Sequence, residues 1–434
     1  MEMLADRFRP DSAWTTKIIV SPQLRENESH LVSIMRRSRE LRDDPVRLFE
    51  LQAEMANEVV HLQQSERAYR SQTEAADSGT EGWSDPRLLA DICRVLAHVI
   101  KVIGDGIAWR ALDYDRVVLH ELAFAPQSGH LSRDTVIQEA TEAAMHLTET
   151  GELVVLTGIT NFLRYGDFVS VSDEGIGVHE VKAGKGSAKS GRSTRQRGRT
   201  RDLIAFLERG ERNVGSETYR LVRLRAKPKS HIPTVAKLCR IARSQGMAHG
   251  RLSDALAAEV IDVQIMAEQE EPGSHRFQDP FSQSGDAGLI HSMNHFGRFS
   301  PNVAPYSVFP FEDDDRVGAI TGGLWLITYI NQGNIVRCLR RRGLRVRVPT
   351  DDELRRGPKN LAPGQIKDHE FDNPIVISNG AATWLIPLGD IGRLAYEFID
   401  EETFADAAEE LLGRQAQREA FTYSAFEDEA SLWD

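Results

Sequence analysis

The stretch LVVLTGITNFLRYGDFVSVSDEGIGVHEVK, residues 153–182, changes the hydrophobic period of the chain. It contains three short apolar runs, at 153–156, 168–171 and 177–181, which are separated by glycines, aspartates and other turn-forming residues. Short apolar runs bounded by such residues are typical of β-strands. The stretch therefore predicts the start of a β-sheet.

The regions on either side of this stretch predict an α/β protein with several domains. Apolar positions at helical spacing before it indicate an all-α region over residues 1–127. Residues 128–266 are predicted to be one compact α/β domain with helices near 194–209 and 232–245 and a strand at 219–224 between them. A linker or surface loop is expected over 267–295, because this segment is rich in acids, Ser, Gly and Gln. The last region, 296–434, is predicted to be α/β, with buried strands at 317–330.

The size and charge of the chain indicate separate domains and a local polyanion-binding segment. A length of 434 residues exceeds what one hydrophobic core usually supports. The net charge of -12 conceals a basic segment, because residues 182–251 contain 19 lysines and arginines against four acids. Such a segment favours binding to a phosphate backbone. A solvated basic face that balances acidic neighbours is the alternative.

The remaining composition favours a cytoplasmic protein without a membrane segment. The three cysteines, Cys93, Cys239 and Cys338, are far apart and odd in number, so they predict neither a disulfide framework nor a thiolate zinc site. The first ten residues are charged and have no apolar core typical of a signal peptide. The longest uncharged apolar run, at about 317–330, is shorter than the roughly 20 residues of a spanning helix.

Acidic and basic side chains are expected to come together at the end of the predicted strand at 177–181. Glu180 and Lys182 are two positions apart, so they share one face of an extended strand while Val181 points to the other. Asp167, thirteen positions before Glu180, is expected on the neighbouring strand. Carboxylates and carbonyls are the ligands that Mg²⁺ and Mn²⁺ prefer. The alternative is that Asp167 only begins a strand after a turn and that Glu180 and Lys182 form a surface ion pair.

This arrangement resembles the PD-(D/E)xK nuclease superfamily, whose signature is an Asp followed after a variable interval by Glu-x-Lys on an adjacent strand. Here Asp167 and the triplet ending at Lys182 match the signature, whereas Gly166 stands where the signature has proline. The resemblance covers residues 130–240 and implies a restriction-endonuclease-like domain. It implies Mg²⁺- or Mn²⁺-dependent hydrolysis of phosphodiester bonds.

The resemblance also implies roles for individual residues. Asp167 and Glu180 would ligate the metal through their carboxylates, the backbone carbonyl of Val181 would add a ligand, and Lys182 would orient the attacking water. Gln196, at the start of the following predicted helix, occupies a position where branches of the superfamily carry a glutamine that helps to hold the site.

The resemblance also implies a further carboxylate near the metal, from the helix that precedes the first strand. Glu139 and Glu142 are three positions apart and lie on nearly one helical face, so either can point inward. Glu139 is favoured.

A basic segment without acids follows the triplet and is expected to contact the nucleic-acid backbone. Such contacts provide affinity that does not depend on sequence. The basic residues are Lys185, Lys189, Arg192, Arg195, Arg197, Arg199 and Arg201.

The sequence thus predicts a cytoplasmic nuclease with DNA as the favoured substrate. Its flanking N- and C-terminal regions are candidates for binding a protein partner, in an arrangement that resembles anti-phage effectors and restriction enzymes. Two alternatives stay open: an inactive nucleic-acid-binding or scaffold subunit with a nuclease-like fold, and a nuclease that cuts RNA.

Overall fold

A computed structural model of the chain describes residues 13–75, 82–123, 133–163, 165–181, 205–206, 209–214, 217–269, 281, 288–293, 303–347, 375–380, 383–386, 393–416 and 421–433. Within these residues, helices combine with four small sheets, three of which are entirely antiparallel. The predicted α/β class is therefore confirmed at this coarse level.

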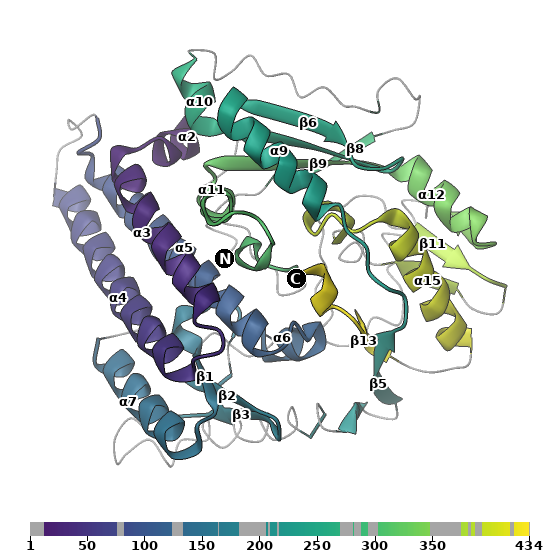
Figure 1. Cartoon of the computed structure of the whole chain (residues 1–434), viewed down its shortest axis with the longest axis horizontal. Helices are drawn as coiled ribbons and strands as arrows, with labels where there is room; N and C mark the ends of the chain where they lie inside the picture. Colours follow the sequence, from purple (N-terminus) through teal and green to yellow (C-terminus); the bar gives the residue numbers. More distant parts are fainter. Residues whose placement is uncertain are drawn as a thin grey trace.

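Helices make up the first part of the chain. They are α2 (Ala13–Ile19), α3 (Pro22–Glu40), α4 (Pro45–Ala75), α5 (Pro86–Ala111), α6 (Arg116–Ala123) and α7 (Arg133–Thr150). Side chains before four of these helices cap their free amides; for example, Ser21 accepts from Leu24 at 3.2 Å and Asp85 accepts from Arg87 at 2.8 Å. Helices α3, α4 and α5 run alongside one another (Figure 1). α5 is buried along most of its length, which explains its many apolar residues.

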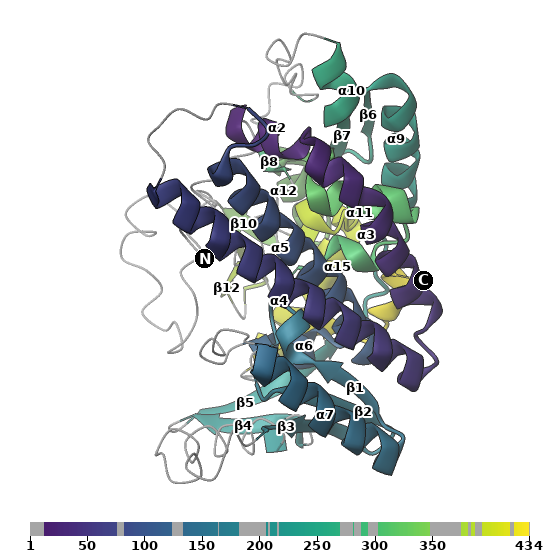
Figure 2. The same cartoon turned by 90° about the vertical axis from the view of Figure 1, so that its left-hand side faces the viewer.

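The stretch 153–182, where the sequence predicted the start of a sheet, forms a three-stranded antiparallel sheet over its described part. Its strands are β1 (Leu153–Leu156), β2 (Phe168–Ser172) and β3 (Gly175–His179), in the order β1-β2-β3. A short 3₁₀ helix, η1 (Thr157–Ile159), follows β1. Helix α7 packs beside these strands at the lower end of the molecule in Figure 2.

Three other sheets contain the remaining strands. β4 (Glu211–Val214) and β5 (Glu217–Leu224) pair with β13 (Phe421–Phe426), and β13 runs parallel to β5. A four-stranded sheet has the order β6 (Met247–Arg251), β7 (Leu256–Asp262), β9 (Leu324–Asn331) and β8 (Gly288–Met293). The last sheet contains β10 (Arg345–Arg347), β11 (Ile375–Ser378) and β12 (Thr383–Ile386).

The other helices cover these sheets. They are α9 (Ile232–Gln245), α10 (Val263–Glu268), α11 (Asp313–Thr321), α12 (Gln332–Arg341) and α15 (Glu401–Ala416), with the short 3₁₀ helices η4 (Tyr306–Val308) and η5 (Ala430–Leu432). α9 packs on β6 and β7 (Figure 2). Among the helices that the structure describes, none is both long and apolar enough to cross a membrane.

The expectation of one compact α/β unit over 128–266 differs from the structure. The strands of this segment belong to three separate sheets, and two of these sheets are completed by β9 and β13 from the last part of the chain. The difference arises because strand pairing between residues far apart in sequence leaves no periodic signal in either strand.

Two local expectations are also wrong. The apolar run at 317–330 is not entirely β, because its first part belongs to α11 and only the second part forms β9. Three aspartates in the first turn of α11 favour a helix start, and Gly322 ends the helix at φ +76°. The segment 267–295 is not only linker, because it contains β8, which pairs with β9.

Buried contacts join the N-terminal helices to the first sheet. One hydrophobic cluster includes residues of α3, α4 and α5 together with Val154, Leu156 and Phe168. The fully buried Gln52 of α4 adds polar contacts, since its amide nitrogen donates to the Val154 carbonyl at 2.8 Å and its oxygen accepts from the Leu156 amide at 2.9 Å. Gln52 thus takes the place of a neighbouring strand at the edge of β1, and fixes the sheet against α4.

Candidate active site

The open end of the β2–β3 hairpin brings Asp167 and Val181 into contact. Phe168 and His179 are the paired residues nearest this end. Just beyond them, the Asp167 amide donates to the His179 carbonyl at 2.7 Å, and the Val181 amide donates to Oδ2 of Asp167 at 2.6 Å. The Asp167 carboxylate therefore lies directly beside the Glu180-Val181 step.

Gly166 allows this approach because of its backbone conformation. Its φ is +68°, in the left-handed region that favours glycine. A Cβ at this position would lie 2.5 Å from the His179 carbonyl oxygen. Proline, whose ring fixes φ near −65°, cannot adopt this conformation. The glycine that stands in place of the superfamily's proline is thus a requirement of this hairpin.

We expect Gly166→Ala to reduce the free energy of unfolding by about 2 kcal/mol or more, because it adds both a left-handed strain and a clash. Gly151→Ala is the matched control, since Gly151 has φ +72° but no atom lies within 4 Å of the position that an added methyl group would take. Denaturant unfolding of both variants separates the two effects. Equal losses in the two variants would show that the contact with the His179 carbonyl is unimportant.

Thr157 holds the backbone of Asp167 from the other side. Its amide donates to the Asp167 carbonyl at 3.1 Å, and its hydroxyl lies 3.0 Å from the carbonyl oxygens of both Gly166 and Asp167. The backbone of Asp167 is thus bonded on both sides, to η1 and to the end of β3. This arrangement fixes the position from which the carboxylate extends.

Helix α7 places Glu139 against Asp167. The two carboxyl groups are hydrogen-bonded to each other. His146, seven positions further along the same face of α7, packs its ring 4.4 Å from that of His179. Glu142 is exposed. Of the two candidate glutamates, the structure therefore brings Glu139 to the site and leaves Glu142 in solvent.

The pair of acids holds a proton at neutral pH. Burial, the negative charge of Asp167 and the hydrogen bond to it raise the pKa of Glu139 to about 8. Burial also raises the pKa of Asp167, while the Val181 amide and the Glu139 hydroxyl oppose this shift by donating to its carboxylate. Glu139 is therefore the protonated donor and Asp167 the acceptor.

Glu180 is not brought into a compact three-acid site. Its Oε1 atom is buried close to the hairpin end. Among the described residues, Glu139, Asp167 and Glu180 do not form a group whose ligand atoms all lie within 4.8 Å of one another. Lys182 and Gln196 lie outside the described residues. So do the basic residues Lys185, Lys189, Arg192, Arg195, Arg197, Arg199 and Arg201.

One group of three possible metal ligands does have its ligand atoms within 4.8 Å of one another, but it lies elsewhere in the fold and was not predicted from the sequence. His231, Asp400 and Glu401 offer ligand atoms within 4.8 Å of one another, and His231 Nε2 lies 3.5 Å from Asp400 Oδ2. These groups have structural partners, since Asp400 caps α15 through the amide of Glu402 at 2.9 Å and Glu401 accepts from Ser253 at 2.6 Å. Residues 169 positions apart carry no local sequence signal for such a group.

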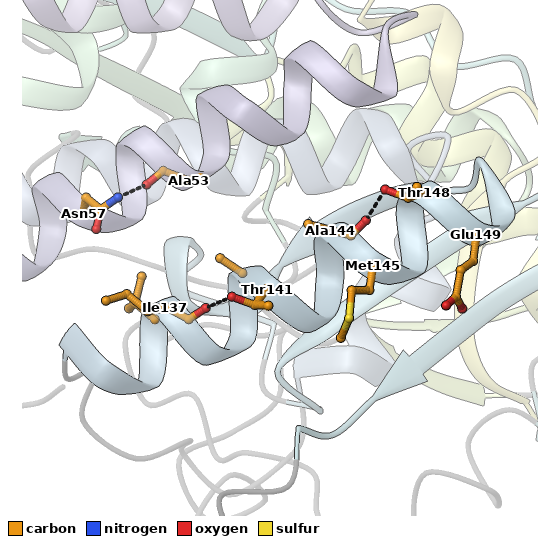
Figure 3. A pocket seen from close by; sticks show the side chains of 10 residues that line it. Ala53, Asn57, Ile137, Thr141, Ala144, Met145, Thr148 and Glu149 are labelled. Atoms are coloured by element: carbon orange, nitrogen blue, oxygen red, sulfur yellow. Dashed lines mark hydrogen bonds between the residues drawn. The ribbon is translucent and has the colours of Figure 1, made fainter.

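A groove between α4 and α7 lies on the other side of α7 from Glu139. It has a volume of about 570 Å³ and a mostly apolar lining that includes Ile137, Ala144 and Met145 (Figure 3). Glu139 is not among the residues that line the groove, and the lining residues Ile137, Thr141 and Thr148 follow the opposite face of α7. The groove is therefore separate from the acid pair.

Comparisons with protein-family models, curated proteins and solved structures find no match for this chain. The chemistry of the site therefore has to follow from its own residues. Two hydrogen-bonded carboxyl groups on a rigid hairpin and helix can release a proton and take up a cation. They can also exchange a proton with a substrate at near-neutral pH.

Proposed function

We propose that this chain is a metal-dependent nuclease that hydrolyses phosphodiester bonds, with DNA as the favoured substrate. The observation that supports this most is the hydrogen-bonded pair of Glu139 and Asp167 beside Val181. Two partly buried acids in contact need a shared proton or a cation between them, since like charges at this distance repel strongly. We place the protein in the cytoplasm, where its three free cysteines would stay reduced.

The residues present fit Mg²⁺ or Mn²⁺, because both side chains of the pair offer hard oxygen ligands and a divalent ion can replace their shared proton. Glu139 and Asp167 would hold the metal, and Glu180 would join them if its side chain turns toward Asp167. A bound metal polarises the phosphate and lowers the pKa of water. The Val181 amide keeps one oxygen of Asp167 fixed. The proposed roles of Lys182 and Gln196 rest on the sequence alone.

A nucleic-acid-binding subunit without activity is the second candidate. The position of Glu180, outside a compact group with Glu139 and Asp167, favours it. In this case the basic segment at 182–201 would bind phosphates while the acid pair serves only to fasten α7 to the hairpin. The two candidates differ in whether any substrate is cut.

Cleavage assays distinguish these candidates. The purified protein is incubated with supercoiled plasmid, linear duplex, single-stranded DNA and structured RNA, each with Mg²⁺, Mn²⁺ or EDTA. We expect metal-dependent cutting of DNA that EDTA abolishes. Cutting of RNA alone would reassign the substrate. Binding that weakens with salt but is never accompanied by cutting under any metal would establish the binding subunit instead.

A further inference from the structure

Five arginines gather where α3, α5 and α11 meet, on elements that lie side by side in Figures 1 and 2. We call them the arginine cluster. Two belong to α3 and one follows it, one is at the end of α5, and one is in α11. They are Arg36, Arg39, Arg42, Arg110 and Arg316.

Asp313 is the acid that three of these guanidinium groups share. Arg36 and Arg39 approach its Oδ2 at 3.4 and 3.3 Å, and Arg316 approaches its Oδ1 at 3.4 Å. Charge-assisted hydrogen bonds between such groups are usually about 2.7–2.9 Å long. All three contacts are longer, so one carboxylate does not satisfy three guanidinium groups at once. Arg42 interacts separately with Asp43 at 3.4 Å.

The two inner arginines have donors that the described residues do not satisfy. The side chain of Arg316 is 5% exposed, and its Nε is buried without a hydrogen-bond partner among the described residues. Nε of Arg110 is in the same situation, although its terminal nitrogens donate to Ser307 at 3.3 Å and to Ser38 at 3.1 Å. Unsatisfied buried donors of a charged group are rare in proteins and call for an explanation.

The cluster is also electrostatically unbalanced. Burial lowers the pKa of Arg316 to about 10 and the charge of Arg39 acts in the same direction, while the carboxylates of Asp313 and Glu312 only partly oppose the shift. Burial likewise lowers the pKa of Arg110 to about 10. Tyr114 opposes this shift, and the charges of the neighbouring arginines of the cluster add to it. Positive charges that disfavour one another in this way gain from a nearby anion. Asp313 lies in the first turn of α11, where the helix amides also favour negative charge.

We propose that the arginine cluster binds a small phosphate-bearing anion, with the exposed Arg36, Arg39 and Arg42 as its direct contacts and Arg110 and Arg316 as the positive charge behind them. Guanidinium groups match the geometry of phosphate oxygens and bind them in pairs of parallel hydrogen bonds. A phosphate offers several oxygens, so it serves several guanidinium groups that now share one carboxylate.

A small anion fits this surface better than a nucleic-acid backbone. Nucleic acids are bound along lines of exposed basic residues that neutralise successive phosphates. Here the charge is focused at one place, and Arg316 is almost completely buried. The cluster is built from α3, α5 and α11, whereas the acid pair is built from α7 and the β2–β3 hairpin. The proposal is therefore independent of nuclease activity.

Binding is measured by titration calorimetry and thermal unfolding of the full chain with inorganic phosphate, pyrophosphate, AMP and sodium chloride at matched ionic strength. We expect saturable binding of the phosphate compounds, with a rise in melting temperature that chloride does not reproduce. Arg36→Gln combined with Arg39→Gln should weaken this binding about tenfold or more, since two charge-assisted contacts are lost. Arg47→Gln, in an exposed arginine of α4, is the matched control and should bind like the wild type.

Each outcome of these titrations has a defined meaning. Tighter binding of AMP than of inorganic phosphate would support a phosphorylated metabolite, and equal binding would support free phosphate. The absence of saturable binding, or binding that the double variant leaves unchanged, would overturn the proposal. A short DNA duplex that binds through Arg36 and Arg39 while the small anions do not would overturn it as well. The double variant should fold, because the side chains of Arg36 and Arg39 are about half exposed. Circular dichroism checks this.

Discussion

Asp167→Asn should reduce metal-dependent cleavage by about 10³-fold or more while leaving the protein folded. Asparagine has the same shape as aspartate, and its side-chain oxygen can still accept the hydrogen bond that the Val181 amide now donates at 2.6 Å. The amide side chain, however, lacks the negative charge that holds a divalent ion. The initial rate of plasmid cleavage, measured over a range of Mg²⁺ concentrations, tests this expectation.

Asp173→Asn is the control for Asp167→Asn. Asp173 lies in the exposed turn between β2 and β3, so its replacement makes the same change of charge on the same hairpin, away from the acid pair. It should cut at a rate close to that of the wild type. An Asp167→Asn protein that is folded and fully active would remove Asp167 from the catalytic site. An unfolded one would instead indicate a structural role, and the metal-linkage experiment below would then decide.

Glu139→Gln should remove a pH dependence of stability that the wild type shows without metal. The folded-state pKa of Glu139, about 8, lies above the ordinary value of 4.5. Below pH 4.5 the group is protonated in both states, so it does not disfavour folding. As the pH rises toward 8, the unfolded state gains from ionisation and the folded state does not, so stability falls. Because the side chain is partly solvated, we expect this difference between wild type and variant to be about 1–3 kcal/mol.

Metal should reverse this loss in the wild type. A divalent ion competes with the proton of the acid pair, so stabilisation by Mn²⁺ should grow as the pH rises from about 6 to 9. Denaturant unfolding at each pH, with Mn²⁺ or EDTA, measures both effects. Glu142→Gln, in the exposed glutamate of the same helix, should behave like the wild type. If Mn²⁺ stabilises Glu139→Gln as much as the wild type, Glu139 is not a ligand.

Local patterns predicted many elements because those elements are determined by neighbouring residues. The helix expected at 232–245 is α9, which begins one residue before Pro233 and ends before Gly246 at φ +86°. The strand expected at 219–224 lies within β5. The partner of β5 was not predictable, because β13 lies at the other end of the chain. The prediction for 317–330 was wrong for another reason: α11 and β9 are both buried, so neither shows a polar periodicity.

The candidate site was likewise predictable only where it depends on neighbouring residues. Helical spacing left both Glu139 and Glu142 able to point inward, with Glu139 only slightly favoured, and it is burial that separates them in the structure, where Glu139 is partly buried and Glu142 is exposed. Gly166 looked like a weaker match to the superfamily signature, since its φ of +68° cannot be deduced from sequence. Whether Glu180 reaches its expected partners depends on side-chain directions at the end of the hairpin, and these are set by tertiary contacts.

The pairing of β5 with β13 also affects how the chain is made. About 200 residues separate these strands, so a ribosome adding about 5–20 residues per second would complete the second strand about 10–40 s after the first. During that interval one side of β5 has no native neighbour, and exposed strand edges of this kind recruit other chains. An edge that can pair with other chains therefore stays open on β5 until β13 has been made.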